Sequence, residues 1–277
     1  MCLISLAWRA DPRYTLVVAA NRDEFHQRPT APLARWGDQP SIIAGRDLEG
    51  NGTWMGTTTT GRFAAITNFR EITPPPPEAP SRGTIVRDFL ESDSTPQAWL
   101  RSLRARADQF AGFNLFVATR DELGFLSNRS ESVRSLEPGV YGLSNGPWDA
   151  NWPKVARAVE GMENALQSSS MENDLFALLR DEEGAPDEGL PDTGIGVERE
   201  RFLSPIFILG KPYGTRSSTV LVVRSDGEVT VREKSWNSDG ELVMAVNGMK
   251  VLDEASQPIT LRDGANVRID AAGMVYE

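Results

Sequence analysis

The chain opens directly into a β-type run, and this feature constrains its fold more than any other. The segment "CLISLAW" at residues 2–8 is followed by the turn-like "RADPR" and by a second β-type run, "YTLVVAANRDE" at 14–24. Short apolar runs bounded by turn residues are typical of buried strands. The sequence therefore predicts a hairpin of buried strands that begins at Cys2, the single cysteine of the chain.

The remaining segments alternate in blocks of strand and helix rather than one by one. Apolar residues three and four apart predict helices at 81–92, 95–110, 152–167 and 171–182, with Thr95 as the N-cap of the second. β-branched and aromatic residues predict strands at 41–47, 52–61, 62–69, 112–130 (a hairpin with "RDE" as its turn), 139–149 and 215–236 (a hairpin around Asp226-Gly227). This block order favours an α+β layered sandwich over an alternating βαβ fold.

Three segments are predicted to lie outside the central layers. The tract "TPPPPEAPS" at 73–81 cannot join a sheet ladder, which predicts an exposed extended loop. The acidic segment 181–200 is predicted to be a surface loop or flap. We expect residues 1–239 to form one domain, and 240–277 to form a β-rich C-terminal extension packed on that domain or continuing it.

Composition excludes several classes of partner and site. With 29 Lys and Arg against 39 Asp and Glu, the net charge of −10 argues against nucleic acid and anionic membranes. One cysteine and one histidine, His26, leave no intrachain disulfide and no zinc cluster. The opening residues lack the pattern of a secretory signal and no apolar run is long enough to cross a bilayer, so the expected compartment is the cytoplasm.

Cys2 follows the initiator methionine, and this position gives its thiol a possible catalytic use. A thiol attacks as its thiolate, whose ordinary pKa near 8.5 requires a base or a positive neighbour at neutral pH. Removal of Met1 would free the α-amine of Cys2, which titrates at about 7.7–8.0 on the nucleophile's own residue. The alternative is a buried cysteine that only packs, which is the common fate of this residue type.

Four polar residues, "NRDE" at 21–24, follow the apolar part of the second strand. On the strand next to Cys2, an arginine would lower the pKa of the thiol, and an aspartate would hold the α-amine by hydrogen bond. The competing interpretation is a solvated turn. The pairing with a cysteine at the start of the neighbouring strand favours the catalytic interpretation.

Several blocks in this order resemble the NRDE family, the transport and Golgi organisation proteins, over about residues 1–235. They are "MCLI", "LVVAANRDEF", "GTWMG", "FAAITNFRE", "GFNLFVA", "YGLSN" and "YGTRSSTVLVV". The NRDE family in turn resembles the cysteine N-terminal nucleophile (Ntn) hydrolases, such as penicillin V acylase, bile salt hydrolase and acid ceramidase. This resemblance implies a four-layer αββα sandwich and cleavage of non-peptide amide bonds.

The resemblance also implies the catalytic residues. The expected set is Cys2, Arg22, Asp23, Asn68, Asn145 and Arg216. In it Asn68 and Asn145 supply oxyanion donors, and Arg216 steadies Asp23 or the thiolate. Arg22 and Asp23 depart from the acylase pattern because they are adjacent, so a regular strand points them to opposite faces. Either a bulge lies there or only one of them faces the thiol. Trp36 and Trp54 are further candidates for the pocket wall.

Two functional hypotheses follow. The first is an Ntn cysteine hydrolase or acyltransferase that cleaves an amide or thioester bond of a small acylated molecule, without a metal or other cofactor. The second is a non-catalytic carrier of haem, acyl-CoA or lipid, in which Cys2 or His26 would ligate haem iron. The sequence leaves the substrate and the oligomeric state open.

Overall fold

The computed structural model describes residues 2–72, 74–75, 78–130, 133–251, 268–269 and 275–276. The predicted opening hairpin is confirmed: β1 (Cys2–Asp11) pairs antiparallel with β2 (Tyr14–Phe25), and Cys2 lies directly opposite Arg22. The "NRDE" residues therefore lie within β2 rather than in a turn after it.

This hairpin forms the middle of a six-stranded antiparallel sheet with the order β10-β1-β2-β11-β12-β13. The other strands are β10 (Gly139–Leu143), β11 (Tyr213–Arg224), β12 (Val229–Trp236) and β13 (Leu242–Val251). The predicted hairpin around Asp226-Gly227 joins β11 to β12. β1 thus lies between β2 and β10, and β11 from the C-terminal part of the chain pairs with β2.

A seven-stranded antiparallel sheet, β3-β4-β5-β6-β7-β8-β9, faces the first one. Its strands are β3 (Thr30–Arg35), β4 (Ile42–Asp47), β5 (Met55–Thr58), β6 (Phe63–Asn68), β7 (Phe113–Ala118), β8 (Leu123–Ser127) and β9 (Val133–Ser135). β3 and β9 were not predicted from the sequence. Both are short edge strands with weak alternation.

Side-chain alternation decides which residues lie between the two sheets. Even-numbered residues of β1 and β2, from Ile4 and Leu16 onward, pack against Phe63 and Phe116 of the second sheet. Odd-numbered residues of the same strands, such as Val17, face the helices on the outside. By the same alternation, Cys2 and Arg22 belong to the face between the sheets.

Helices cover the two outer faces. α1 (Gly83–Glu91) and α2 (Pro96–Arg104) lie on the second sheet, whereas α3 (Pro153–Leu166) and α4 (Met171–Leu178) lie on the first. Thr95 caps α2 as predicted, because its hydroxyl accepts a hydrogen bond from the Ala98 backbone N–H. Two 3-10 turns, Ala107–Gln109 and Asp187–Gly189, complete the helical elements outside α5.

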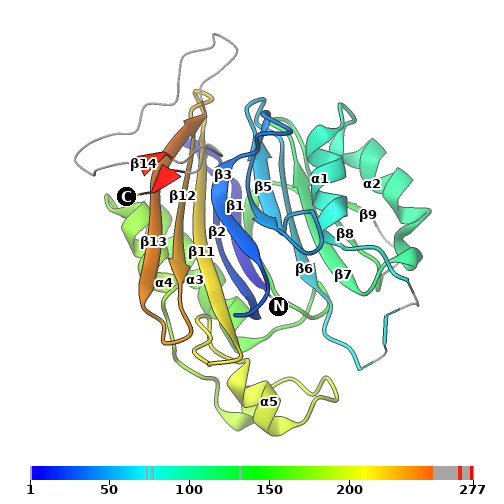
Figure 1. Cartoon of the computed structure of the whole chain (residues 1–277), viewed down its shortest axis with the longest axis vertical. Helices are drawn as coiled ribbons and strands as arrows, with labels where there is room; N and C mark the ends of the chain where they lie inside the picture. Colours follow the sequence, from blue (N-terminus) through cyan, green and yellow to red (C-terminus); the bar gives the residue numbers. More distant parts are fainter. Residues whose placement is uncertain are drawn as a thin grey trace.

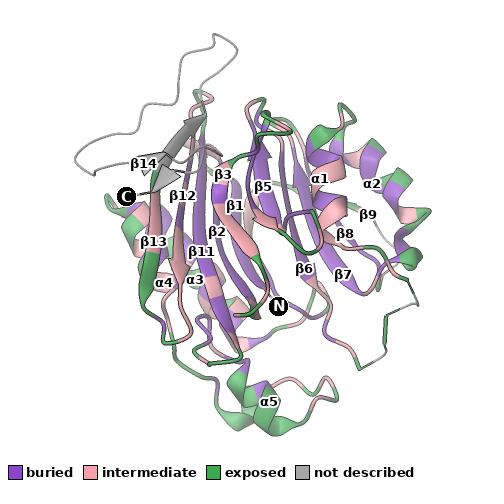
Figure 2. Ribbon diagram, viewed as in Figure 1, coloured by how far each residue is buried: buried purple, intermediate pink, exposed green. Residues whose placement is uncertain are grey.

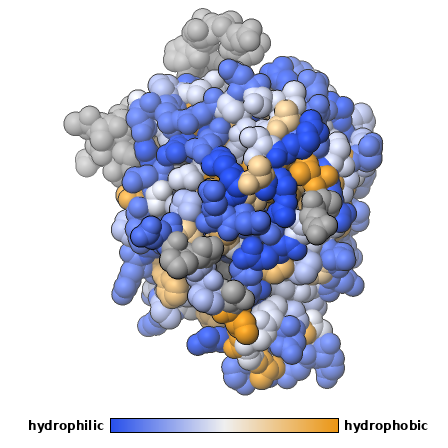
Figure 3. Space-filling model, turned by 90° about the vertical axis from the view of Figure 1, so that its right-hand side faces the viewer, coloured by the Kyte–Doolittle hydropathy of each residue, from blue (hydrophilic) through white to orange (hydrophobic). Residues whose placement is uncertain are grey.

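The resulting order of layers is helix, sheet, sheet, helix (Figure 1). The α+β class and the four-layer αββα sandwich are therefore confirmed. Figure 2 shows the inner strands of both sheets buried, with exposure on the edge strand β13, at the turns and on the outer helix faces. The side that carries α1 and α2 is mainly hydrophilic, interrupted by small apolar areas (Figure 3).

One predicted surface segment is more ordered than expected. Within 181–200 the chain starts a further helix, α5 (Val197–Phe202), and Glu200 is only 3% exposed. The prediction of a plain surface loop is therefore wrong at its C-terminal end. In the proline-rich tract, the described residues 74–75 and 78–81 form neither helix nor strand, as expected.

The C-terminal region adds to the first sheet. β13 pairs with β12, and the short strands β14 (Arg268–Ile269) and β15 (Val275–Tyr276) pair with each other. Residues 252–267 lie outside the described residues, and the domain boundary at 239 stays a prediction. Among the helices that the structure describes, none is both long and apolar enough to cross a membrane.

Candidate active site

A cavity of about 580 Å³ opens between the two sheets at the N-terminal end of β1. Cys2 lines it together with Arg22, Asp23, Trp54, Asn68 and Arg82. The segment 78–83, which leads into α1, forms part of its wall. The cavity therefore collects residues from both sheets around the first strand residue of the chain.

The Cys2 thiol is enclosed but reaches this cavity. Its residue is 9% exposed, and burial raises the pKa of the thiol above its usual value. The charge of Asp23 also raises this pKa, whereas Arg22 and a hydrogen bond from the Asp23 backbone lower it. The effect of burial is larger than that of the groups that lower the thiol pKa, so the Cys2 thiol is protonated at neutral pH.

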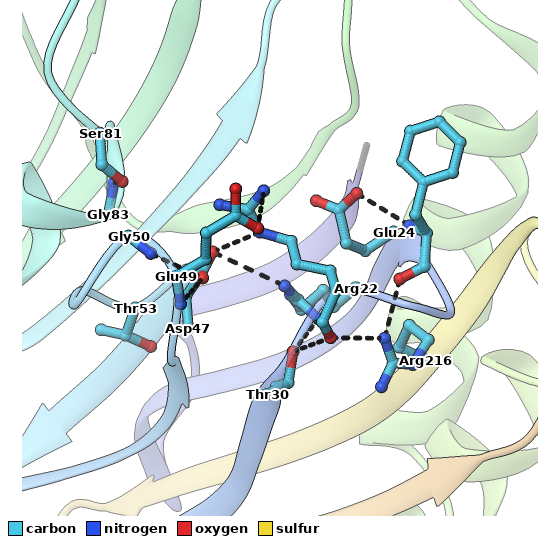
Figure 4. A network of polar contacts seen from close by, with 12 residues as sticks. Arg22, Glu24, Thr30, Asp47, Glu49, Gly50, Thr53, Ser81, Gly83 and Arg216 are labelled. Atoms are coloured by element: carbon cyan, nitrogen blue, oxygen red, sulfur yellow. Dashed lines mark hydrogen bonds and ion pairs between the residues drawn. The ribbon is translucent and has the colours of Figure 1, made fainter.

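Arg22 crosses from the first sheet to the second. Its guanidinium stacks on Trp54 with 4.3 Å between the guanidinium carbon and the ring centre, and it donates to the Thr30 hydroxyl at 3.1 Å. A terminal nitrogen lies 3.9 Å from Asp47 Oδ2. Figure 4 shows Arg22 held between Thr30 and Asp47. These contacts fix a buried positive charge opposite Cys2 in the β1–β2 register.

Asp23 points its carboxylate to the other face of the sheet. Oδ1 accepts a hydrogen bond from the Thr215 hydroxyl at 2.7 Å, and the Thr215 hydroxyl itself accepts from the Ile208 backbone N–H at 2.9 Å. Burial raises the pKa of Asp23, while the positive charge of the N-terminal amine, the charge of Lys154 and the Thr215 hydrogen bond lower this pKa. Asp23 still lines the cavity at the end of the strand, but of the adjacent pair only Arg22 contacts the second sheet.

A bulge does occur beside this pair, but in the partner strand. Asp23 pairs with Thr215 and Arg22 pairs with Ser217, so Arg216 is the extra residue of β11. Its guanidinium donates to the carbonyl oxygens of Phe25 at 2.9 Å and Arg28 at 3.2 Å (Figure 4). The bulge thereby directs Arg216 toward the end of β2.

Arg216 lines a second cavity, of about 190 Å³, rather than the one that holds Cys2. Arg22 and Trp54 line both cavities, so their stacked pair lies between the two spaces. Arg216 therefore neighbours Arg22 but is not among the described residues around the thiol. A direct contact with the thiolate, one of the roles that the resemblance implied, finds no support in this placement.

The two predicted asparagines lie side by side but have different surroundings. Asn68 lines the cavity, and no hydrogen bond of its side chain is found among the described residues. Asn145 is fully buried, and its Nδ2 donates to the Asn68 carbonyl oxygen at 2.8 Å. The neighbouring Ser144 hydroxyl donates to the Cys2 carbonyl oxygen at 3.2 Å. Asn68 thus presents an open amide, while Asn145 holds the backbone behind it.

Asn21 and Trp36 turn out to be structural. The Asn21 side chain donates to the carbonyl oxygens of Leu179 and Ile206 and accepts from Ser218, on the helix side of the sheet. Trp36 is buried in the core beneath α1 and α2. Of the two tryptophan candidates for the cavity wall, the structure places only Trp54 there.

Three residues near the thiol were not predicted from the sequence. They are Thr215, which holds Asp23; Lys154, buried behind the sheet; and Arg82, which lines the cavity and donates to the Gly112 carbonyl oxygen at 2.9 Å. Thr215 lies inside the block "YGTRSSTVLVV", which carries the family resemblance, and this block was its signal in the sequence. Arg82 lies at the start of the helix predicted at 81–92, which gave no sign of a role at the cavity. Lys154 gave none, since its burial depends on packing.

The match to a known family covers most of the chain. Residues 1–238 match the family described as Transport and Golgi organisation 2. The chain belongs to this family. It is 33% identical over 264 residues to the Transport and Golgi organization 2 homolog of Mus musculus, which covers 85% of this chain and 93% of the mouse protein. The Drosophila melanogaster family member, Transport and Golgi organization protein 2, is 25% identical over 264 residues, covering 85% and 92%.

The solved structures that align with most of this chain share little sequence identity with it. The penicillin V acylase of Agrobacterium tumefaciens aligns with a TM-score of 0.49 and 13% identity, over 84% of this chain and 83% of the acylase. A Caenorhabditis elegans ortholog of N-acylethanolamine-hydrolyzing acid amidase gives a TM-score of 0.48 and 13% identity, over 80% and 92%.

Among the described residues, no group of three or more His, Cys, Asp or Glu side chains converges in a way that could hold a metal ion. His26 is not among the described residues lining the Cys2 cavity, and its Nε2 lies 3.0 Å from the Gly210 carbonyl oxygen. His26 therefore lies apart from Cys2 in the described structure, and ligation of haem iron by Cys2 or by His26 stays a prediction.

Proposed function

We propose that this protein is an N-terminal cysteine nucleophile hydrolase or acyltransferase. It would cleave an amide or thioester bond in a small acylated molecule. One observation carries the proposal: the Cys2 thiol lines a cavity together with the buried Arg22 and the Asn68 amide. The Asp23 carboxylate follows Arg22 on β2, the strand that pairs with β1. A cysteine that only packed would not require this arrangement.

The mechanism depends on the nitrogen of Cys2. While Met1 is attached, this nitrogen is an amide and cannot accept a proton; once Met1 is removed, it is an amine on the nucleophile's own residue. Because burial raises the pKa of the thiol, a preformed thiolate is disfavoured. The amine therefore acts as a general base that takes the thiol proton as sulfur attacks the substrate carbonyl carbon.

The remaining steps return the enzyme to its starting state. The attack forms a C–S bond and places negative charge on the carbonyl oxygen, which the Asn68 amide N–H can stabilise. The protonated α-amine then gives its proton to the leaving amine or thiol as the C–N or C–S bond breaks. Water, or an acceptor alcohol or amine, releases the acyl group by the same steps in reverse order.

The cavity supports a small and partly polar substrate. Its volume of about 580 Å³ lies within the range of small-molecule sites, about 300–1,000 Å³. Arg22, Arg28 and Arg82 lie among its lining residues beside the carboxylates of Asp47 and Glu49. Charged walls of this kind favour a substrate with a polar head near the scissile bond.

The first test asks whether the thiol is activated. Intact mass establishes whether Met1 has been removed, and alkylation by iodoacetamide near pH 7 then measures Cys2 reactivity. Although the thiol is protonated at rest, we expect faster alkylation than for a free cysteine, because the freed α-amine takes the thiol proton as sulfur attacks the reagent. We expect a large loss of this rate in Asp23→Ala and no reaction in Cys2→Ser. Retention of Met1, or slow alkylation unaffected by Asp23→Ala, would overturn the proposal.

The second test identifies the reaction. A panel of acyl amides and acyl thioesters is incubated with the Met1-free protein, and acyl-enzyme on Cys2 is detected by intact mass after acid quench. We expect at least one substrate to add its acyl mass to the wild type and not to Cys2→Ser. Saturable binding of acyl-CoA without any acyl-enzyme or turnover would favour a carrier instead.

A further inference from the structure

The second cavity, of about 190 Å³, lies beyond the stacked Arg22 and Trp54 as seen from the cavity of Cys2. Its lining comes from β3 of one sheet and from β11, β12 and β13 of the other. Cys2 is not among the described residues that line it, whereas Arg22 and Arg216 both are. The proposed function assigns no role to this space.

The two arginines of this cavity are joined by a chain of hydrogen bonds. Arg22 Nη1 donates to the Thr30 hydroxyl at 3.1 Å, and this hydroxyl donates to the Arg28 carbonyl oxygen at 3.2 Å. The same carbonyl oxygen accepts a hydrogen bond from Arg216 Nη1 at 3.2 Å (Figure 4). Two positive charges are therefore held close together by hydroxyl and backbone oxygens, which carry no formal charge.

The charge of Arg216 is not neutralised by an ion pair. No carboxylate of a described residue is within ion-pair distance of its guanidinium, whose partners are two backbone carbonyl oxygens. The buried Glu233 also lines the cavity, but its two oxygens accept hydrogen bonds from the Leu33 backbone N–H at 2.8 Å and from the Thr219 hydroxyl at 3.0 Å. Like charges repel most strongly where little water screens them. Arg22 and Arg216 therefore favour an anion in the space that they share.

Two serine side chains on neighbouring strands also line the cavity. Ser217 of β11 pairs with Ser235 of β12, so both lie on the face between the sheets. Ser217 is only 5% exposed, and its hydroxyl has no hydrogen-bond partner among the described residues. A buried hydroxyl without a partner is costly, and an oxygen of a ligand in the cavity would satisfy it. This hydroxyl thus indicates a polar ligand independently of the arginine charges.

Apolar side chains form much of the remaining lining. Pro32 of β3, Trp236 of β12 and Met244 of β13 line the cavity together with Trp54. A cavity of about 150 Å³ is large enough for one benzene ring, so a volume of about 190 Å³ admits an acid group with an apolar part of that size. An inorganic anion would make no apolar contact with these walls. The lining therefore fits a ligand that has an anionic group and a short apolar part.

We propose that this cavity binds a small organic monocarboxylate, whose oxygens accept hydrogen bonds from Arg216 and Ser217 and whose apolar part packs against Trp236. Hydrogen bonds between a guanidinium and a carboxylate are charge-assisted and are among the strong ones in proteins. The bound carboxylate neutralises the arginine charge at the cavity. The inference does not depend on the proposed function, because Cys2 is not among the described residues that line this cavity.

The test measures binding to the full chain by isothermal titration calorimetry near pH 7. Benzoate and butanoate are the monocarboxylates, benzamide is the uncharged counterpart, and inorganic phosphate is the anion without an apolar part. We expect saturable binding of both acids, and binding at least about tenfold weaker for benzamide and for phosphate. Arg216→Gln should weaken benzoate binding by about tenfold or more, and Ser217→Ala several-fold. Arg82→Gln is the matched control, because Arg82 lines the cavity of Cys2 and not the second one, and it should bind benzoate like wild type.

Several outcomes would overturn this inference. They are the absence of saturable binding of either acid, equal binding of benzamide, and binding of phosphate as tight as that of benzoate. Loss of benzoate binding in Arg82→Gln with retention in Arg216→Gln would place the ligand in the cavity of Cys2 and overturn it as well. If Arg216→Gln does not fold, Ser235→Leu decides, because the larger side chain takes up space in the cavity. We expect Ser235→Leu to weaken benzoate binding, and unchanged binding would contradict the site.

Discussion

Arg22 and Asp23 are consecutive in the chain, yet they serve opposite faces of the same sheet. Arg22 stacks on Trp54 between the sheets, whereas Asp23 bonds Thr215 on the helix side. The strand alternation of β2 predicts this division from the sequence alone. The bulge at Arg216 was not predictable, since it lies 194 residues further along and depends on how β11 pairs with β2.

At this scale, Thr215→Val tests how Asp23 is held. The change removes the donor to Asp23 and the acceptor for the Ile208 N–H without a large change in volume. We expect slower Cys2 alkylation at pH 7 and a loss of roughly 1–3 kcal/mol in unfolding free energy. Thr219→Val is the matched control, because Thr219 donates to a different buried carboxylate, Glu233. It should lose stability but keep Cys2 reactivity, and equal reactivity in both variants would contradict the assignment.

Lys154→Met should change the pH dependence of stability. A lysine whose pKa falls from 10.5 to about 8 on folding binds more protons in the unfolded state between those values, so wild-type stability rises with pH across that window. At about 1.4 kcal/mol per pKa unit the effect is roughly 3 kcal/mol. We expect the variant to be more stable than wild type at pH 7, with the difference shrinking toward pH 10.5. Urea unfolding at both pH values measures this, and a less stable variant at pH 7 would contradict it.

Among the elements, those with strong periodicity were predicted well. The expected helices at 152–167 and 171–182 correspond to α3 and α4, and the expected hairpin at 215–236 corresponds to β11 and β12. α5 was not predicted because its six residues are too few for a periodic signal. Its buried Glu200 pairs with Arg70, 130 residues earlier, which stacks on Trp152, and it also accepts a hydrogen bond from the Thr193 backbone N–H at 3.0 Å.

The ion pair of Arg70 with Glu200 should anchor α5 to the end of β6. Glu200→Gln leaves the arginine charge buried without its carboxylate, a change that typically costs about 3–5 kcal/mol. We expect faster amide hydrogen exchange in 193–203 and a lower melting temperature. Glu198→Gln, which removes an exposed partner of Arg201 on the same helix, should leave both nearly unchanged. Equal exchange in the two variants would show that α5 does not depend on the ion pair.

The whole molecule brings the candidate site together from distant parts of the chain. Cys2, Arg22, Asp23 and Asn68 meet at one cavity, while Arg216 stands behind Arg22 and Asn145 behind Asn68. The family resemblance supplied these six positions, but the division between lining and supporting residues required the packed sheets. The position of Arg82 could not be predicted from the sequence. It lines the cavity of Cys2 because the segment 78–83, which leads into α1, forms part of the cavity wall.

A truncation tests the predicted domain boundary at this scale. A chain that ends at Asp239 lacks β13 and leaves the backbone of β12 unpaired at a sheet edge. Exposed edges of this kind promote association between molecules. We expect this chain to form larger species by light scattering than a chain ending at Val251, which keeps β13. Identical scattering and melting temperature for the two would place an independent domain boundary at 239.

The position of Cys2 in the central hairpin has a practical consequence for handling the protein. Because β1 begins at Cys2 and that residue already lines the cavity, any affinity tag fused ahead of it would begin at the wall of the cavity. Such a tag would convert the amine into a peptide bond and crowd the entrance used by ligands. Purification handles therefore belong at the other terminus, or behind a protease site whose cleavage leaves cysteine as the first residue.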